Sequence, residues 1–102
     1  MNDDESAAIE TAKQTGIPYA SFANKILAMQ KSQGLSVMVP KEFARKDFIF
    51  PLFIDGNVLA VAMANPTDQA LIDQLQQSSG FNIQPFIATK EELLRAIDES
   101  YV

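Results

Sequence analysis

The hydrophobic positions of this 102-residue chain are densest between residues 48 and 66, where the sequence reads FIFPLFIDGNVLAVAMANP. The first half of this segment is apolar at both odd and even positions, with Phe50 on one face and Phe53 on the other, so a strand formed there has no polar face. Asp55-Gly56 follows, a dipeptide that tolerates the positive φ angles of a tight hairpin turn. We therefore predict a β-hairpin that is covered on both of its faces.

The second strand of the predicted hairpin alternates large and small side chains. Its two faces carry Leu59, Val61 and Met63 on one side and Ala60, Ala62 and Ala64 on the other. The alanine face has no bulk to hold a neighbouring element at a distance, because an alanine side chain is a single methyl group. We expect a helix to pack closely there, and the helix that follows the hairpin is the candidate.

Before the hairpin, helical periodicity predicts helices over residues 4–15, 21–33 and 41–46. Glycines follow the first two, at Gly16 and Gly34, where a helix commonly ends. Residues 35–39 alternate in hydrophobicity and fit either a short strand or an extended connector.

After the hairpin, Asn65-Pro66-Thr67-Asp68 has the composition of a helix start, with Asn65 or Thr67 as the cap, and the helix should run to Ser79. Residues 82–88 read as a strand at the edge of a sheet, because Pro85 has no amide hydrogen to donate to a ladder. The segment 89–92 has the form of a capping box, which opens a last helix.

The order of these elements predicts an α+β fold. A small mixed sheet is built on the β-hairpin plus a β-α-β crossover, is packed with helices, and is preceded by N-terminal helices. The crossover should be right-handed and its two strands parallel. We expect residues 1–38 to form an N-terminal helical segment and connector, and residues 39–102 to form an α-β-β-α-β-α core domain.

Charge and composition exclude several classes of function. The chain has 13 Asp and Glu against 8 Lys and Arg, a net charge of −5, which argues against binding nucleic acid or an anionic membrane. It contains no Cys and no His, and no apolar run approaches the roughly 20 residues of a membrane span. The acidic N-terminus is unlike a signal peptide. We therefore expect a cytoplasmic location with no direct membrane insertion.

Candidate catalytic chemistry is sparse, and we expect neither an enzyme nor a cofactor in this chain. The four glycines are too scattered for a P-loop, and the serines have no histidine to act as a base. Lys41, Arg45 and Lys46 form the one basic cluster. They are candidate ligands for an anion or an acidic partner, or alternatively the solvated end of a short helix whose dipole favours positive charge.

A set of short motifs also carries a resemblance to a known family. It comprises Val39-Pro40, Phe43-Ala44, Pro51-Leu52, Gly56, residues 59–68, Gly80, Ile83, Pro85 and Ala88-Thr89. With the upstream run QTGIPY at residues 14–19, the pattern resembles the N-terminal domain of type II secretion and type IV pilus assembly ATPases, over residues 12–102. The family usually has Ala-Asp-Pro where this chain has Ala64-Asn65-Pro66, and Asp and Asn are equally good helix caps.

The resemblance implies a non-catalytic module that precedes a hexameric ATPase motor. In that family the module docks the motor onto the cytoplasmic domain of an inner-membrane platform protein, so the location implied is cytoplasmic and peripheral to the bacterial inner membrane. A linker and the motor domain are then expected beyond Val102.

The alternative function is a sensing domain for cyclic di-GMP or another anionic ligand. Some relatives, called MshEN-type, bind cyclic di-GMP through motifs that begin Arg-Leu-Gly and end near a Gln. Here only Gln14 could be the tail of such a motif, and the sequence contains no Arg-Leu-Gly. Sensing by this chain would therefore use the basic cluster or a motif upstream of the chain.

Overall fold

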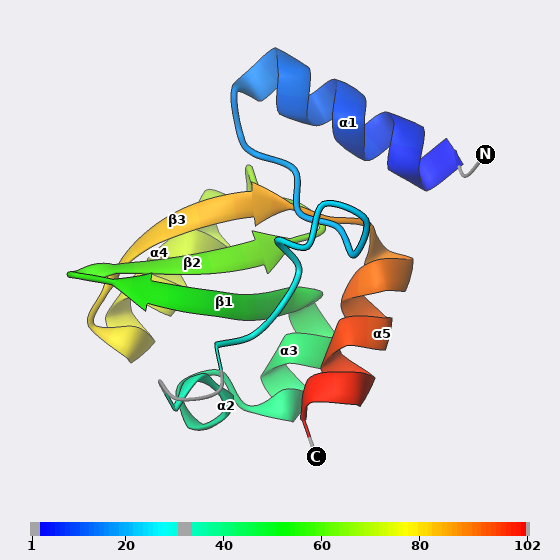
Figure 1. Ribbon diagram of the computed structural model, residues 1–102. Coiled ribbons are helices and arrows are strands. Elements are labelled where there is room, and N and C mark those ends of the chain that lie inside the picture. Colours follow the sequence, from blue (N-terminus) through cyan, green and yellow to red (C-terminus); the bar gives the residue numbers. More distant parts are fainter. Residues whose placement is uncertain (1–2, 31–33, 102) are drawn as a thin grey trace.

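The computed structural model describes residues 3–30 and 34–101, with side chains from residue 6 onward. Its elements in chain order are α1 (Asp3–Thr15), α2 (Leu35–Met38), α3 (Lys41–Asp47), β1 (Ile49–Asp55), β2 (Val58–Met63), α4 (Gln69–Ser79), β3 (Asn82–Ile87) and α5 (Lys90–Ser100). The strands form one mixed sheet in the order β1-β2-β3, with helices on both of its sides (Figure 1). The predicted α+β fold is confirmed, while the predicted boundary between residues 38 and 39 stays a prediction.

The predicted hairpin is formed by β1 and β2, which pair in antiparallel fashion. Asp55 pairs with Val58, so the loop consists of Gly56 and Asn57, one residue later than the predicted turn. Gly56 has a φ of +63°, a left-handed conformation that costs glycine little because it has no Cβ atom. A two-residue loop therefore closes the hairpin as the sequence indicates.

A bulge in β1 changes which side chains share a face of the sheet. The register shifts between Pro51 and Phe53. Phe50 pairs with Ala62 and Phe53 pairs with Ala60, so the two phenylalanines lie on the same face. Strict alternation would have placed them on opposite faces, which is what the sequence pattern predicted.

The crossover from β2 through α4 to β3 is parallel, as predicted, and α4 lies behind the sheet in Figure 1. The Met63 carbonyl accepts a hydrogen bond from the Ala88 amide of the neighbouring chain segment (3.1 Å). The Met63 carbonyl therefore points toward β3. In a strand of L-residues, the direction of the carbonyl determines the face on which the side chain of the same residue lies. Here the side chains of Leu59, Val61 and Met63 lie on the face that a right-handed crossover covers with its helix. The prediction that α4 packs on the alanine face is therefore wrong.

Helix α4 is capped by Asp68, the residue before its first helical residue, Gln69. The carboxylate of Asp68 accepts a hydrogen bond from the Leu71 amide (3.2 Å), so Asp68 is the cap rather than Asn65 or Thr67. Leu71, Ile72 and Leu75 form the buried stripe of the helix, as its periodicity predicted.

Residues 18–30, which we call the connector, cross the other face of the sheet (Figure 1). At one end, Ala20 donates to the Ile87 carbonyl and Pro18 accepts from the Ile87 amide, both at 2.8 Å, on the outer edge of β3. At the other end, the Gln30 amide donates to the Leu52 carbonyl on the outer edge of β1 (2.8 Å). The connector thus spans the sheet from edge to edge on the face that carries the alanines.

The helix predicted over residues 21–33 is wrong, and residues 31–33 lie outside the described residues. The side chain of Asn24 accepts from the amides of Ser21 and Ile26 and donates to the Tyr19 carbonyl, at 2.8 to 3.0 Å. These bonds replace helical ones, and Lys25 has a φ of +64°, which breaks a right-handed helix. Asn24 therefore holds the connector in a tight turn.

The short strand or extended connector expected at residues 35–39 is also wrong. Residues 35–38 form the one-turn helix α2, which buries Leu35 and leaves Val37 exposed. The helix predicted at 41–46 is confirmed as α3, which follows Pro40, buries Ala44 and ends at Phe48 with a φ of +54°. Helix α3 then packs against α5.

Helix α5 holds the connector through its first turns. Thr89 caps the helix by accepting from the Glu92 amide (3.2 Å), which confirms half of the predicted capping box. The Glu92 carboxylate accepts from the backbone amide of Phe22, 70 residues earlier (3.2 Å), and the Arg95 guanidinium lies 5.1 Å from the Phe22 ring centroid. The connector is therefore attached to α5 as well as to both sheet edges.

Candidate functional site

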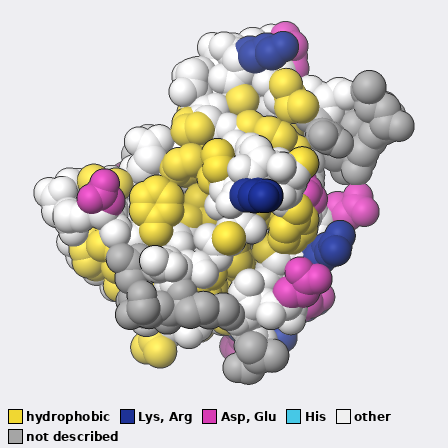
Figure 2. Space-filling model, in the orientation of Figure 1, with side chains coloured by type: hydrophobic (Ala, Val, Ile, Leu, Met, Phe, Trp, Pro, Cys, Tyr) yellow, Lys and Arg dark blue, Asp and Glu magenta, His cyan; other side chains and the backbone are white. Residues whose placement is uncertain are grey.

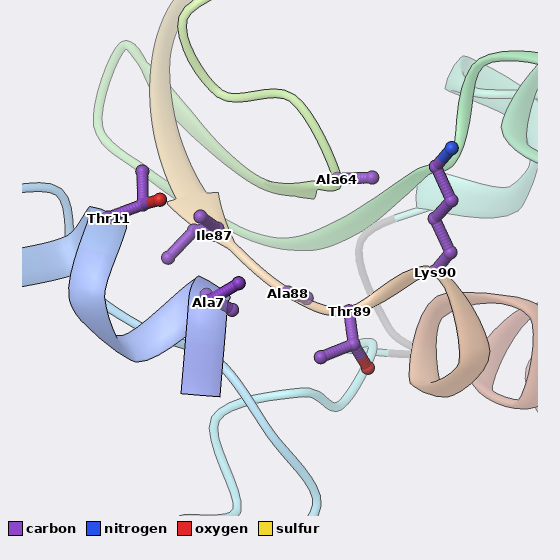
Figure 3. Close-up of a pocket in the computed structure, with 8 residues that line it drawn as sticks. Ala7, Thr11, Ala64, Ile87, Ala88, Thr89 and Lys90 are labelled. Atoms are coloured by element: carbon purple, nitrogen blue, oxygen red, sulfur yellow. The ribbon is translucent and has the colours of Figure 1, made fainter. Parts of the chain in front are cut away.

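The hollow between α1 and the end of β3 is lined mainly by small side chains (Figure 3). Ala7 and Thr11 of α1 face Ala64, Ile87 and the residues that start α5 across a volume of about 260 Å³. Thr89 is engaged in capping α5, and the Lys90 ammonium lies 5.0 Å from the Phe48 ring centroid. Methyl groups dominate this hollow, which offers few polar groups to a ligand.

A second hollow lies between the connector and β1, and we call it the connector hollow. It is lined by Lys25, Ile26, Ala28, Met29, Gln30, Leu52 and Phe53, and its volume is about 380 Å³. Phe53 is 39% exposed, and its ring makes an edge contact with Phe86 at a centroid distance of 6.4 Å. Figure 2 shows hydrophobic side chains gathered on the same face of the molecule. The connector hollow is therefore an accessible apolar surface.

The predicted basic cluster lies on α3, with Lys41, Arg45 and Lys46 all exposed. Arg45 forms an ion pair with Asp98 of α5, at 2.5 Å between Nη1 and Oδ1. Both side chains are about half exposed, so the pair adds little stability, but Asp98 offsets the positive charge of Arg45. The structure thus brings the three predicted residues together on one helix, with one of them neutralised.

Lys41 also lines a shallow hollow with Ser36, Pro40, Ser100 and Tyr101. The buried environment of Tyr101 raises the pKa of its phenol above the ordinary value, because burial disfavours the charged phenolate. Lys25, which could have joined the basic cluster, lines the connector hollow instead. Lys25 and Lys41 therefore line separate hollows.

Catalytic and metal chemistry has little support in the part of the chain that the structure describes. Among residues 3–30 and 34–101, no three His, Cys, Asp or Glu side chains gather to hold a metal ion. In those same ranges no helix is long and apolar enough to cross a membrane. The hydroxyl of Ser21 accepts from the Asn24 amide (3.1 Å), so it stabilises the connector turn.

Comparison with known protein families identifies the family to which this sequence belongs. Residues 16–102 match the MshEN domain. This chain belongs to the MshEN domain family. The match covers the connector, the sheet and helices α2 to α5, and it leaves α1 outside.

The curated relatives of this MshEN domain include two type IV pilus assembly ATPases named PilB. The protein of Myxococcus xanthus (strain DK1622) is 30% identical over 90 residues, which is 88% of this chain and 15% of that protein. The protein of Acinetobacter baylyi (strain ATCC 33305 / BD413 / ADP1) is 31% identical over 64 residues, 63% of this chain and 11% of that protein. The MshEN domain therefore spans a small part of these relatives.

Two solved structures share the fold. The N-terminal domain of XpsE (crystal form I4122) superposes with a TM-score of 0.79 at 16% identity, covering 93% of this chain and 64% of that chain. The structure of MshE with cdg superposes with a TM-score of 0.74 at 20% identity, covering 89% and 63% respectively. At these identities, both structures show a shared fold.

Sequence reasoning missed the connector hollow of this MshEN domain. A helix over residues 21–33 would bury Ile26 and Met29 in its apolar stripe, and the predicted hairpin would have Phe53 on a covered face. The signal that could have found the hollow is Asn24, because asparagine bonds its own backbone neighbours and favours turns over helices. Once a turn replaces the helix, its apolar residues lose their assigned partners and become candidates for a surface site.

Proposed function

We propose that this MshEN domain is a non-catalytic docking and regulatory domain of a secretion or pilus assembly ATPase. It would link a downstream motor domain to the cytoplasmic domain of an inner-membrane platform protein, and so lie peripheral to the bacterial inner membrane through that partner. The observation that carries the proposal is the family match over residues 16–102 together with the similarity to PilB across 88% of the chain.

The surfaces of the domain support docking rather than catalysis. The connector hollow offers exposed Ile26 and Phe53, and α3 offers exposed Lys41 and Lys46. Apolar groups surrounded by polar ones are the usual composition of a protein interface. The sequence also lacks the glycine-rich phosphate loop that nucleotide hydrolysis would need.

Calorimetry tests the docking function directly. The isolated domain is titrated with the purified cytoplasmic domain of the platform protein encoded with it, and nucleotide hydrolysis is assayed in parallel. We expect a saturable complex with a Kd of about 1 to 100 μM, in the range of transient interfaces, and no hydrolysis. Absence of association at several hundred micromolar would contradict the docking function for this chain.

The second candidate function is binding of cyclic di-GMP or another anionic ligand, with Lys41, Arg45 and Lys46 as the proposed ligand-binding residues. It is favoured by the shared fold with MshE, whose structure is described with cdg. An affinity for the anionic ligand that falls as the salt concentration rises, and that falls further in Lys41→Ala and Lys46→Ala, would support this function. If the spectrum of the chain does not change on titration with cyclic di-GMP, binding of that ligand by this chain is ruled out.

A further inference from the structure

Exposed large hydrophobic side chains are unevenly distributed over the described residues. Among the described residues, three large hydrophobic side chains are exposed: Ile26 at 37%, Val37 at 83% and Phe53 at 39%. Ile26 and Phe53 line the same hollow, although they are 27 positions apart in the sequence. Two apolar side chains held together at the surface form a patch, whereas Val37 is an isolated one of the kind found on any protein.

The connector hollow also has a defined electrostatic character. Among the described residues that line it, Lys25 is the one with an ionisable side chain, and none is acidic. The chain as a whole is acidic, with a net charge of −5, so a positive rim is a local exception. An apolar floor with a single cation at its edge complements an apolar side chain that lies next to a negative charge.

The position of Lys25 is fixed by the turn in which it lies. Its left-handed backbone, with φ at +64°, is uncommon for a residue that has a Cβ atom. The neighbouring Asn24 side chain stabilises that turn through bonds to Ser21, Ile26 and Tyr19. Lys25 and Ile26 are thus held at the rim before any partner arrives, which lowers the entropic cost of binding.

We propose that the connector hollow docks a segment of a partner protein that presents an apolar side chain beside a carboxylate. The apolar side chain would contact Ile26, Met29 and Phe53, and the carboxylate would pair with the Lys25 ammonium. The identity of the partner as the platform protein's cytoplasmic domain rests on the docking function proposed above, whereas the chemistry of the hollow does not.

A peptide titration tests the chemistry of the hollow without the natural partner. The probe is an acetylated and amidated peptide of alternating Leu and Asp, followed by backbone amide NMR shifts of the ¹⁵N-labelled chain. We expect saturable shifts at Lys25, Ile26 and Phe53 with a millimolar Kd. A peptide of alternating Leu and Lys should bind at least about fivefold more weakly, since it reverses one close charge pair. Amide shifts centred elsewhere would overturn the assignment. So would the absence of shifts at a peptide concentration of about 5 mM, which is near the expected Kd.

Four substitutions provide matched comparisons. Ile26→Ser and Lys25→Glu alter the hollow, and each should lower the affinity for the Leu-Asp peptide by about fivefold or more. Val37→Ser and Lys13→Glu make the same kinds of change outside it, on α2 and α1, and should leave the affinity unchanged. All four residues are exposed, so the variants should fold, and equal losses in all four would overturn the site.

The same variants separate the site from the docking function. If the platform protein's cytoplasmic domain binds and the first two variants weaken it selectively, both proposals hold. If that domain binds all variants equally, docking uses another face and the hollow is not its interface. If it fails to bind while the Leu-Asp peptide still shifts Ile26 and Phe53, the docking function fails and the chemistry of the hollow stands.

Discussion

The phenol of Tyr101 donates a hydrogen bond to the backbone carbonyl of Val39, 62 residues earlier, at 2.5 Å. The Tyr101 ring also makes an edge contact with the fully buried Phe50, at a centroid distance of 6.4 Å and an interplanar angle of 71°. Arg45 and Asp98 join α3 to α5 a few residues away. The end of α5 is therefore fastened to the segment that leads into α3 and β1.

Replacing Tyr101 by Phe should lower the free energy of unfolding by about 1 to 2 kcal/mol. The ring contact with Phe50 survives, but the carbonyl of buried Val39 loses its donor. Urea unfolding followed by far-UV circular dichroism measures the difference. Gln77→Ala, a change at an exposed position of α4, leaves the phenol in place and serves as the comparison. A change below 0.3 kcal/mol for Tyr101→Phe, less than the usual ~0.5 kcal/mol minimum for a hydrogen bond, would show that the bond contributes little.

Alkaline pH should destabilise the protein through Tyr101. Burial raises the pKa of this phenol in the folded state above its ordinary value of 10.0, so the folded state holds its proton more tightly than the unfolded state does. The contribution to stability is complete below pH 10 and is lost as the pH rises above it. Tyr101→Phe should flatten the stability profile above pH 10 in urea titrations. Parallel profiles for the two proteins would contradict this assignment.

Replacing Asn24 by Ala should destabilise the connector by about 1 to 3 kcal/mol. The amides of Ser21 and Ile26 and the carbonyl of Tyr19 lose their side-chain partner, so the turn that contains Lys25 loses three hydrogen bonds. Hydrogen exchange should accelerate at the amides of Ser21 and Ile26 while α4 remains protected. Asn82→Ala, an exposed asparagine at the start of β3, provides the control. Unchanged exchange in the connector would show that other contacts hold the turn.

Replacing Ala62 by Leu should cost roughly 1 to 3 kcal/mol through overpacking. Ala62 is fully buried on the face that the connector crosses, and it pairs with Phe50 on one side and Phe86 on the other. Ala70→Leu adds the same atoms at an exposed position of α4 and should be close to neutral. Thermal unfolding of both variants makes the comparison, and equal stability would place a void beside Ala62.

Local sequence signals succeeded where a short segment determines its own conformation. Gly56 closes the hairpin, Thr89 caps α5, and the apolar stripe of α4 is buried. Each of these depends on residues a few positions apart, so propensity and periodicity are sufficient to find them. The basic residues of α3 likewise come together because they lie on two turns of one helix.

The errors that changed the picture of the site concern contacts between distant segments. The connector has apolar residues at helical spacing, but its backbone is bound by Asn24, Ile87, Glu92 and Leu52. The face covered by α4 depends on crossover handedness combined with strand register, and the bulge in β1 alters that register for Phe53. Alternation of large and small residues alone does not say which face meets a helix.

The sequence by itself determined the sheet-forming segments, the helices that have caps, the acidic charge and the family resemblance that the MshEN match confirms. Only the tertiary structure decided that residues 18–30 cross the sheet without forming a helix, and that Ile26 and Phe53 line one hollow. The physical reason is the range of the interactions. Caps and turns bond neighbours in sequence, whereas the connector is held by bonds to β1, β3 and α5 that exist only after those elements have packed.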